Sequence, residues 1–147
     1  MGLIDLVPSR DASNQSDMFL RNRVRHAVLP ALGAENPNLE ATLCRTAVAM
    51  REVAEALDWA ADTAARTAVV DRAPGAIQLD ADILMMLPAG VRKRLLGRVA
   101  SELGCSLEAR HLDALAALPA LPRGRSLDLP RLTARRALTR IDLQAKN

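Results

Sequence analysis

Aromatic side chains are nearly missing from this sequence: among 147 residues there is one Trp, one Phe and no Tyr. This scarcity excludes a single-strand-binding surface built on rows of stacking rings. Long hydrophobic runs are also missing, since no apolar stretch approaches the roughly 18 residues that a membrane helix needs. The first residues lack the basic and apolar regions of a signal peptide. We therefore expect a soluble, cytoplasmic chain with no membrane partner.

The cysteines, glycines and histidines exclude several kinds of site. Cys44 and Cys105 lie far apart without a CxxC pair, which excludes a zinc ribbon or thioredoxin-like motif and favours a reducing compartment. The glycines form no Rossmann or Walker phosphate loop, and no Ser or Cys is spaced with a His as a nucleophile pair. Asp80 and Asp82 are typical helix caps rather than an acid–base pair. We predict no catalytic residue, no metal site and no cofactor bound by this chain alone.

The basic residues are almost all arginine. The chain has 20 basic residues, of which only Lys93 and Lys146 are lysine, and a net charge of +3. Arginine binds planar anions through two parallel hydrogen bonds, which favours phosphate ligands. A composition generally biased toward Ala, Arg and Leu explains the same count. Charge by itself therefore leaves RNA or DNA binding open.

Periodicity and turn signals predict a mainly α-helical fold, a helical bundle with one long helix and a small β element at the C-terminus. The long helix begins at Asn36-Pro37, a cap followed by proline, and extends to about residue 70. Shorter helices are expected over residues 88–103 and 107–118, after a short strand over residues 76–79 and a turn of helix capped by Asp80 or Asp82. Two more strands are expected over residues 126–129 and 137–143. The predicted domains are a linker with a basic helix, residues 1–35, and a helical substrate domain with the β element, residues 36–147.

The segment before the long helix carries the densest basic cluster. A polar turn, formed by Asp11, Ser13 and Asn14, leads into a helix that is expected to begin at residue 16 or 17 and end near residue 29. Leu20, Val24 and Val28 form its apolar stripe, which we expect to be buried. The candidate polyanion-binding residues are Arg21, Asn22, Arg23, Arg25 and His26. Asn22, Arg25 and His26 point away from the stripe on a regular helix, as a binding face would, although a solvated basic face fits the same pattern.

Arginines also accumulate near the C-terminus. They are Arg123, Arg125, Arg131, Arg135, Arg136 and Arg140, and only Asp128 opposes them before Asp142. Arginine on strands or irregular backbone commonly holds RNA through its phosphates and shape. The same side chains can instead cover a small sheet with their aliphatic stems. We select Arg131, Arg135 and Arg136 as candidate RNA contacts.

Residues 11–32 resemble the signature of the bacterial tRNA(Ile)-lysidine synthetases. In that family an Asp-Pro-Ser-Asn turn leads into an Arg-Asn-Arg-x-Arg helix that ends in Leu-Pro-x-Leu. This chain reads Asp-Ala-Ser-Asn over residues 11–14, Arg-Asn-Arg-Val-Arg-His over residues 21–26 and Leu-Pro-Ala-Leu over residues 29–32. Ala12 stands where the family favours proline, a change that removes no functional group.

The resemblance implies an activity for a complete enzyme. The family ligates lysine to C2 of the wobble cytidine of an isoleucine tRNA with a CAU anticodon, after ATP has adenylated that cytidine. ATP, with Mg implied, is held by an N-terminal α/β domain whose Ser-Gly-Gly-x-Asp-Ser pyrophosphate loop (PP-loop) is absent from this sequence. The implied partners are tRNA(Ile) with the CAU anticodon and a PP-loop domain in cis or trans, and DNA is not among them.

The resemblance also implies roles for the motif residues. The arginines and the asparagine of residues 21–25 would lie near the anticodon nucleotide and the ATP phosphates, and the turn of residues 11–14 would position their helix. We assign no chemical step to any of them and expect the chain alone to be inactive as a ligase. Two alternatives stay open: a non-catalytic helical module that docks on an acidic protein, and an inactive truncated form. Salt-sensitive binding of tRNA would discriminate the first from the RNA-binding hypothesis.

Overall fold

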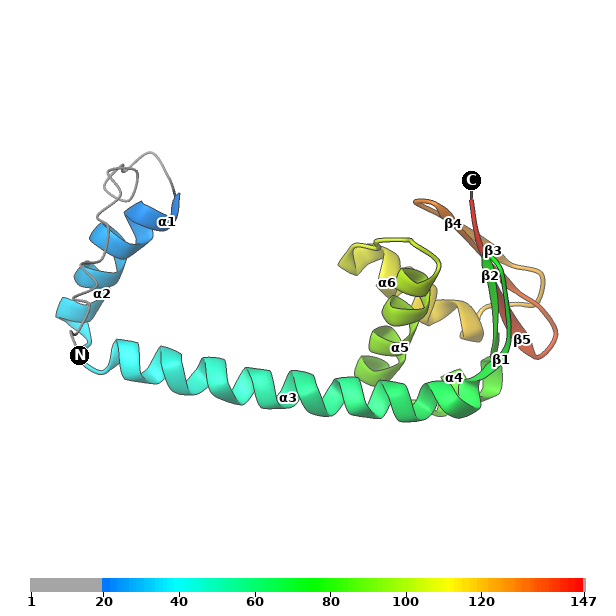
Figure 1. The fold of residues 1–147 in the computed structure, drawn as a ribbon, viewed down its shortest axis with the longest axis horizontal. Helices are drawn as coiled ribbons and strands as arrows, with labels where there is room; N and C mark the ends of the chain where they lie inside the picture. The colour runs from blue at the N-terminus through cyan, green and yellow to red at the C-terminus, as the bar shows by residue number, and fades with distance from the viewer. Residues whose placement is uncertain (1–19, 147) are drawn as a thin grey trace, which may run out of the picture. The chain divides into compact units, whose positions relative to one another are not determined.

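The computed structural model describes residues 20–146, which fall into two compact units (Figure 1). The first unit extends to Met50 and the second begins at Arg51, so the division falls within the helix α3 (Leu39–Ala68). The sequence predicted a domain boundary between residues 35 and 36, which lies inside the first unit. The predicted turn formed by Asp11, Ser13 and Asn14 lies outside the described residues.

Short helical segments make up the first unit. They are α1 (Leu20–Arg23), the π-helical turn η2 (Val24–Val28), α2 (Leu29–Glu35) and the first residues of α3. Asn36 ends α2, and its Oδ1 accepts a hydrogen bond from the backbone N–H of Asn38 at 3.1 Å. This side chain therefore marks the junction at which the long helix was predicted to begin.

A five-stranded antiparallel sheet organises the second unit. Its strands are β1 (Val69–Ala73), β2 (Ala76–Asp80), β3 (Ser126–Leu129), β4 (Leu132–Arg136) and β5 (Arg140–Ala145). Their order is β1-β2-β5-β4-β3, so the central pairing joins β2 to β5, with Asp80 opposite Arg140. Side chains alternate between the two faces of each strand. Ile77, Leu79, Ile141 and Leu143 lie on the buried face.

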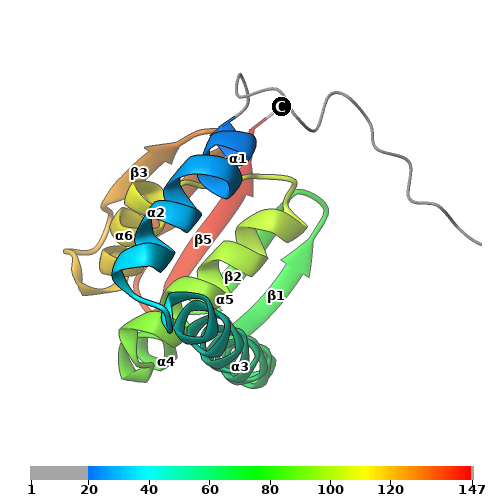
Figure 2. The same cartoon turned by 90° about the vertical axis from the view of Figure 1, so that its left-hand side faces the viewer.

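Helices cover one face of this sheet (Figures 1 and 2). They are α4 (Ala81–Met86), α5 (Ala89–Glu102), α6 (Ala109–Ala117) and the short 3-10 turn η3 (Leu118–Ala120). Asp80 caps α4 by accepting hydrogen bonds from the N–H groups of Asp82 and Ile83 at 2.9 and 3.0 Å, as predicted. Gly104 follows α5 with a φ of 73°, a conformation that glycine adopts without steric cost.

One hydrophobic core joins the helices of the second unit to its sheet. The inward residues of β2, β4 and β5 pack with Leu95, Leu96 and Val99 of α5 and with Leu115 of α6. Burial of this apolar surface supplies the main driving force for folding. Within residues 20–146, no helix combines the length and the apolar character needed to cross a membrane.

The predicted mainly helical fold with a C-terminal sheet is confirmed, but the extent of the sheet was underestimated. The sequence predicted that residues 69–70 would end the long helix and that residues 71–75 would form a turn, whereas residues 69–73 form the strand β1. The strand predicted over residues 137–143 is confirmed at residues 140–143, which lie in β5, but residues 137–139 form the turn before it, and β4 was not predicted. The arrangement of the helices as a bundle stays a prediction.

Candidate functional site

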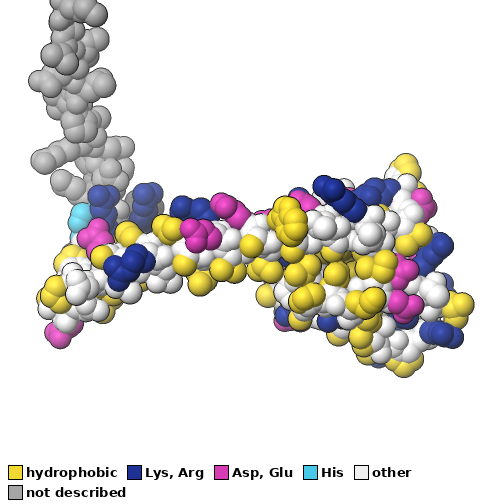
Figure 3. Space-filling model, turned by 90° about the horizontal axis from the view of Figure 1, so that it is seen from below, with side chains coloured by type: hydrophobic (Ala, Val, Ile, Leu, Met, Phe, Trp, Pro, Cys, Tyr) yellow, Lys and Arg dark blue, Asp and Glu magenta, His cyan; other side chains and the backbone are white. Residues whose placement is uncertain are grey.

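The predicted basic segment lies in α1 and η2. Arg21, Arg23 and Arg25 are exposed, as is His26, and none of the three arginines forms an ion pair with any residue between 20 and 146. Basic side chains and a histidine gather on the N-terminal helices in the space-filling view (Figure 3). The segment includes the π-helical turn, a rare conformation that is frequent at functional sites.

The burial predicted for this segment was wrong in two respects. Leu20 is 69% exposed, and Val24 and Val28 are also exposed, so the apolar stripe is not buried within the described residues. Asn22, which was expected to face outward, is only 8% exposed. The prediction assumed a regular turn of 100° per residue from residue 16 to residue 29. The four-residue helix α1 and the π-helical turn break that regularity, because a π turn closes its hydrogen bonds five residues apart.

A cavity of about 600 Å³ lies beside Arg25. Its lining comes from α2, from the Asn36–Pro37 junction and from the start of α3, and includes Gly33, Glu40 and Cys44. Cys44 is an exposed, free cysteine. No pattern in the sequence indicated this cavity, because the residues of its wall have the pattern of a helix end and a helix start.

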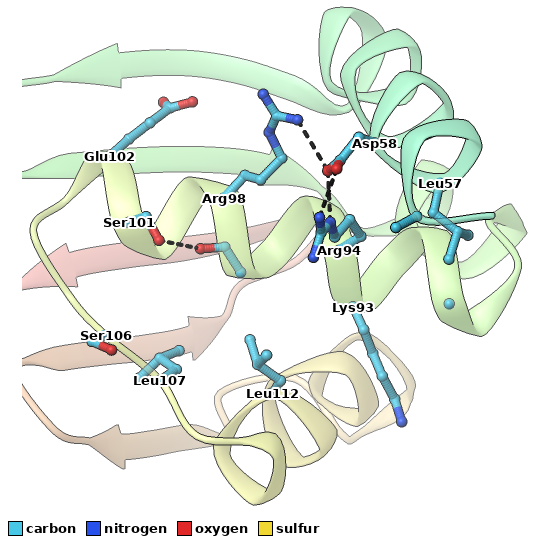
Figure 4. A pocket seen from close by; sticks show the side chains of 13 residues that line it. Leu57, Asp58, Lys93, Arg94, Arg98, Ser101, Glu102, Ser106, Leu107 and Leu112 are labelled. Carbon is cyan, nitrogen blue, oxygen red and sulfur yellow. Dashed lines mark hydrogen bonds and ion pairs between the residues drawn. The ribbon is translucent and has the colours of Figure 1, made fainter. Parts of the chain in front are cut away.

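A second groove, of about 750 Å³, lies between α3, α5 and α6 of the second unit (Figure 4). Asp58 on α3 accepts two hydrogen bonds from Arg94 on α5, from Nε and from Nη2, both at 2.6 Å. Arg98 pairs with Asp58 at 3.3 Å and with Asp62 at 2.9 Å, and Lys93 pairs with Asp113. The cations of this groove are therefore already neutralised by carboxylates of the same unit.

The bidentate pair also changes the ionisation of its members. The hydrogen bonds from Arg94, aided by the nearby Arg98 charge, hold the pKa of Asp58 below its ordinary value despite the desolvation of the carboxyl. The same contact raises the pKa of Arg94. Gly90 and Gly97 lie on the α5 face that borders the groove, where added Cβ atoms would come into ordinary van der Waals contact with Leu57 at 3.7 Å and with Leu112 at 3.5 Å. Their spacing of seven residues is the sequence signal that would have indicated this face.

The three strand arginines selected from the sequence differ in their surroundings. Arg131 is exposed in the β3–β4 turn with a φ of 58°, and Arg135 is exposed on β4 opposite Asp142. Arg136 is only 8% exposed, and its Nη1 donates to the carbonyl oxygens of Ala137 at 3.2 Å and Arg140 at 3.5 Å. RNA contact by Arg136 therefore stays a prediction, for a side chain that is largely buried. Its even spacing from Leu132 places it on the buried face of β4.

Relatives of this chain share one name. A tRNA(Ile)-lysidine synthase from Thermobifida fusca is 41% identical over 133 residues, which covers 87% of this chain and 40% of the relative. Proteins of the same name from Leifsonia xyli and Dehalococcoides mccartyi are 38% and 33% identical over 128 residues, covering 85% of this chain and 39% and 27% of the relatives. The chain belongs to the tRNA(Ile)-lysidine synthase family. No family model matches it.

This member of the tRNA(Ile)-lysidine synthase family spans 40% or less of the length of these three relatives. Residues 20–146 contain no cluster of three or more His, Cys, Asp or Glu side chains that could hold a metal ion. What the described residues offer instead is two sets of arginines without carboxylate partners, one in α1 and η2 and the other in the C-terminal strands and turns. Such groups can bind anions, but they supply neither a nucleophile nor a general base.

Proposed function

We propose that this chain is the tRNA-binding part of a tRNA(Ile)-lysidine synthase, whose complete form ligates lysine to the wobble cytidine of tRNA(Ile) with a CAU anticodon. The observation that carries the proposal is the absence of carboxylate partners for Arg21, Arg23 and Arg25 within the described residues. Three like charges within five residues of a helix repel one another by tenths of a kcal/mol per pair. A bound polyanion would remove that repulsion.

Phosphate is the anion that these side chains suit best. A guanidinium donates two parallel hydrogen bonds to a phosphate, and it stays charged at any physiological pH. The exposed π-helical turn presents Arg25 and His26 from backbone that differs from an ordinary helix. The relatives named tRNA(Ile)-lysidine synthase support RNA, rather than an acidic protein, as the source of the phosphates.

The complete reaction requires more than this chain's described residues supply. We infer that a PP-loop domain, in cis or in trans, binds ATP with Mg and carries out the adenylation in the cytoplasm. The exposed apolar side chains of the first unit support contact with such a domain. They include Leu20, Leu29, Leu32 and Leu43, each more than 40% exposed. Neighbouring apolar side chains left in water mark a surface that another protein part can cover.

Direct titration of the full chain tests the tRNA-binding proposal. Fluorescently labelled tRNA(Ile) with a CAU anticodon would be titrated at two salt concentrations, against methionine tRNA with the same anticodon. We expect binding that weakens steeply with salt, as phosphate contacts require, and that favours the isoleucine species. Salt-insensitive binding, or no binding of either tRNA, contradicts the proposal.

Substitution of Arg21, Arg23 and Arg25 tests whether these three residues make the phosphate contacts. The slope of log K against log salt is negative, and the triple variant Arg21→Gln, Arg23→Gln, Arg25→Gln should reduce its magnitude by about 2 to 3. Each lost phosphate contact removes a little under one unit. Arg45→Gln is the matched control, since Arg45 is an exposed arginine of the same unit that donates to Thr42 Oγ1 at 3.1 Å. The control should keep the full slope, and both variants should unfold at the temperature of the unsubstituted chain.

A further inference from the structure

Positive charge is concentrated in the C-terminal strands and turns. Residues 121–146 contain seven basic residues and two carboxylates, a net charge of +5, whereas the whole chain carries +3. The remaining 121 residues therefore have a net charge of −2. In the rest of the second unit the cations mostly have partners, such as Arg72 with Glu102, Arg94 with Asp58 and Arg110 with Glu108. In residues 121–146 the structure pairs only Lys146, with Asp128.

Backbone hydrogen bonds bring four of these arginines to one end of the sheet. We name them the arginine edge: Arg123, Arg125, Arg136 and Arg140. The turn over residues 122–125 is attached to the end of β4, because the N–H of Gly124 donates to the Arg136 carbonyl at 2.7 Å and the N–H of Arg136 donates to the Arg125 carbonyl at 2.8 Å. Gly124 has a φ of 83°, which a residue with a side chain would adopt only with strain. The N–H of Ala137 donates to the Arg140 carbonyl at 2.8 Å, so the start of β5 is attached to the same point.

One member of the arginine edge, Arg136, is a buried cation. Arg136 is 8% exposed, and its buried Nε has no hydrogen-bond partner. Its guanidinium contacts the carbonyls of Ala137 and Arg140 and no carboxylate within residues 20–146. A buried charge without a counterion is unfavourable, and an anion arriving from solvent would relieve it. The backbone N–H of Arg136 donates directly to the carbonyl of Arg125, so two basic residues are neighbours at this end of the sheet.

The nearest carboxylates do not neutralise these groups. Asp80 lies opposite Arg140 in the β2–β5 register, but its carboxylate caps α4 through two backbone N–H groups. Asp142 lies opposite Arg135, on the face of the sheet away from Arg136, and within residues 20–146 it forms no ion pair with Arg135 or Arg140. Arg140 donates to the neutral Gln78 Oε1 at 2.8 Å, and the exposed Arg123 and Arg125 have no ion pair among the described residues. The positive charge of the edge therefore stays available to a ligand.

We propose that the arginine edge is an RNA-phosphate binding site of the second unit, separate from the basic segment of α1 and η2. This inference rests on the proposed function, because the phosphates are taken to be those of the tRNA backbone. Arg123, Arg125 and Arg140 contact the phosphates, since all three are exposed on neighbouring backbone segments. Arg136 is a positioning residue that holds the β4–β5 turn by its carbonyls and adds an uncompensated charge below the surface. Such contacts fix the orientation of an RNA without reading its sequence.

The test is the double variant Arg123→Gln, Arg125→Gln in the full chain, titrated with labelled tRNA(Ile) bearing CAU at several salt concentrations. Both residues are exposed, so the variant should fold as the unsubstituted chain does. We expect binding to weaken several-fold. The magnitude of the slope of log K against log salt should fall by about 2, one unit for each phosphate contact. The matched control is Arg72→Gln, Arg110→Gln, which removes the same charge from the same unit at two ion-paired sites and should keep the slope. Equal loss in both double variants would mean that net charge alone acts, and would overturn the proposal.

Three further outcomes are decisive. An unchanged slope in Arg123→Gln, Arg125→Gln, together with a lowered slope in the triple variant of α1 and η2, overturns the arginine edge and leaves the proposed function standing. If the unsubstituted chain binds no tRNA, both proposals are overturned. Poly-glutamate that competes as well as tRNA at equal charge concentration overturns the RNA site in favour of an acidic protein segment.

Discussion

The cap of α4 offers a stability prediction whose size follows from the contacts. Asp80 Oδ1 accepts hydrogen bonds from the N–H groups of Asp82 and Ile83, and α4 is only six residues long. Replacing Asp80 by alanine leaves both N–H groups without this acceptor and should lower the free energy of unfolding by about 1 kcal/mol, within a range of roughly 0.5 to 2. In a cooperative unit of about 100 residues, such a loss lowers Tm by roughly 4–8 °C.

The assay is thermal and urea unfolding followed by circular dichroism, with two control variants. Asp80→Asn keeps the capping oxygen and should stay within a few tenths of a kcal/mol of the unsubstituted chain. Asp82→Ala removes an exposed first-turn charge that caps nothing, and should cost less than Asp80→Ala. Unfolding of Asp80→Ala that is indistinguishable from the unsubstituted chain, or equal losses in Asp80→Ala and Asp80→Asn, would refute the assignment of the cap.

Two further predictions concern packing and pH. Leu96→Ala should destabilise the chain by about 2–5 kcal/mol because Leu96 is fully buried, whereas Leu20→Ala should cost under about 0.5 kcal/mol in urea unfolding; similar losses would contradict the described burial. The Asp58 carboxyl should titrate below 3.8 by NMR and move back toward 3.8 in Arg94→Gln. Because folding lowers the pKa of Asp58, the ion pair stabilises the folded chain at pH values above the pKa of the unfolded state. This stabilisation is lost as the pH falls through the pKa of the folded state. A titration midpoint of Asp58 at or above 3.8 would contradict the ion pair.

Local sequence signals predicted the helix boundaries that are marked by a capping or terminating residue. Asp80 as a cap and Gly104 as a stop both act through backbone groups within a few residues of themselves, so sequence is sufficient to find them. The edge strand β1 was missed because four of its five residues are exposed, so it shows no alternation of buried and exposed positions. The turn at residues 137–139 contains no Gly, Pro or Asn, and without that signal the predicted strand began at residue 137, three residues before β5, while β4 was not predicted.

The candidate site was predictable in composition but not in exposure. The run over residues 21–26 and the C-terminal arginines were visible as charge, and the run also carried the family resemblance. Which arginines are exposed depends on strand limits: once β4 begins at Leu132, Arg136 is placed on the buried face by alternation, while Arg135 faces out. The arginine edge itself needs the attachment of residues 122–125 to Arg136, a contact between segments that no local pattern indicates.

The strand order also has a consequence for how the chain reaches its native state. β1 pairs with β2, β3 with β4 and β4 with β5, each through a short turn, but the pairing of β2 with β5 joins Asp80 to Arg140 across the intervening helices. The loop between these partners is about 60 residues long, and its closure loses chain entropy before the central contacts form. Local hairpins and helices can form quickly, whereas joining them at the sheet centre is the slow, nonlocal event. The arginine edge lies within residues 123–140, on strands that pair locally, so its segments can come together before the centre of the sheet closes.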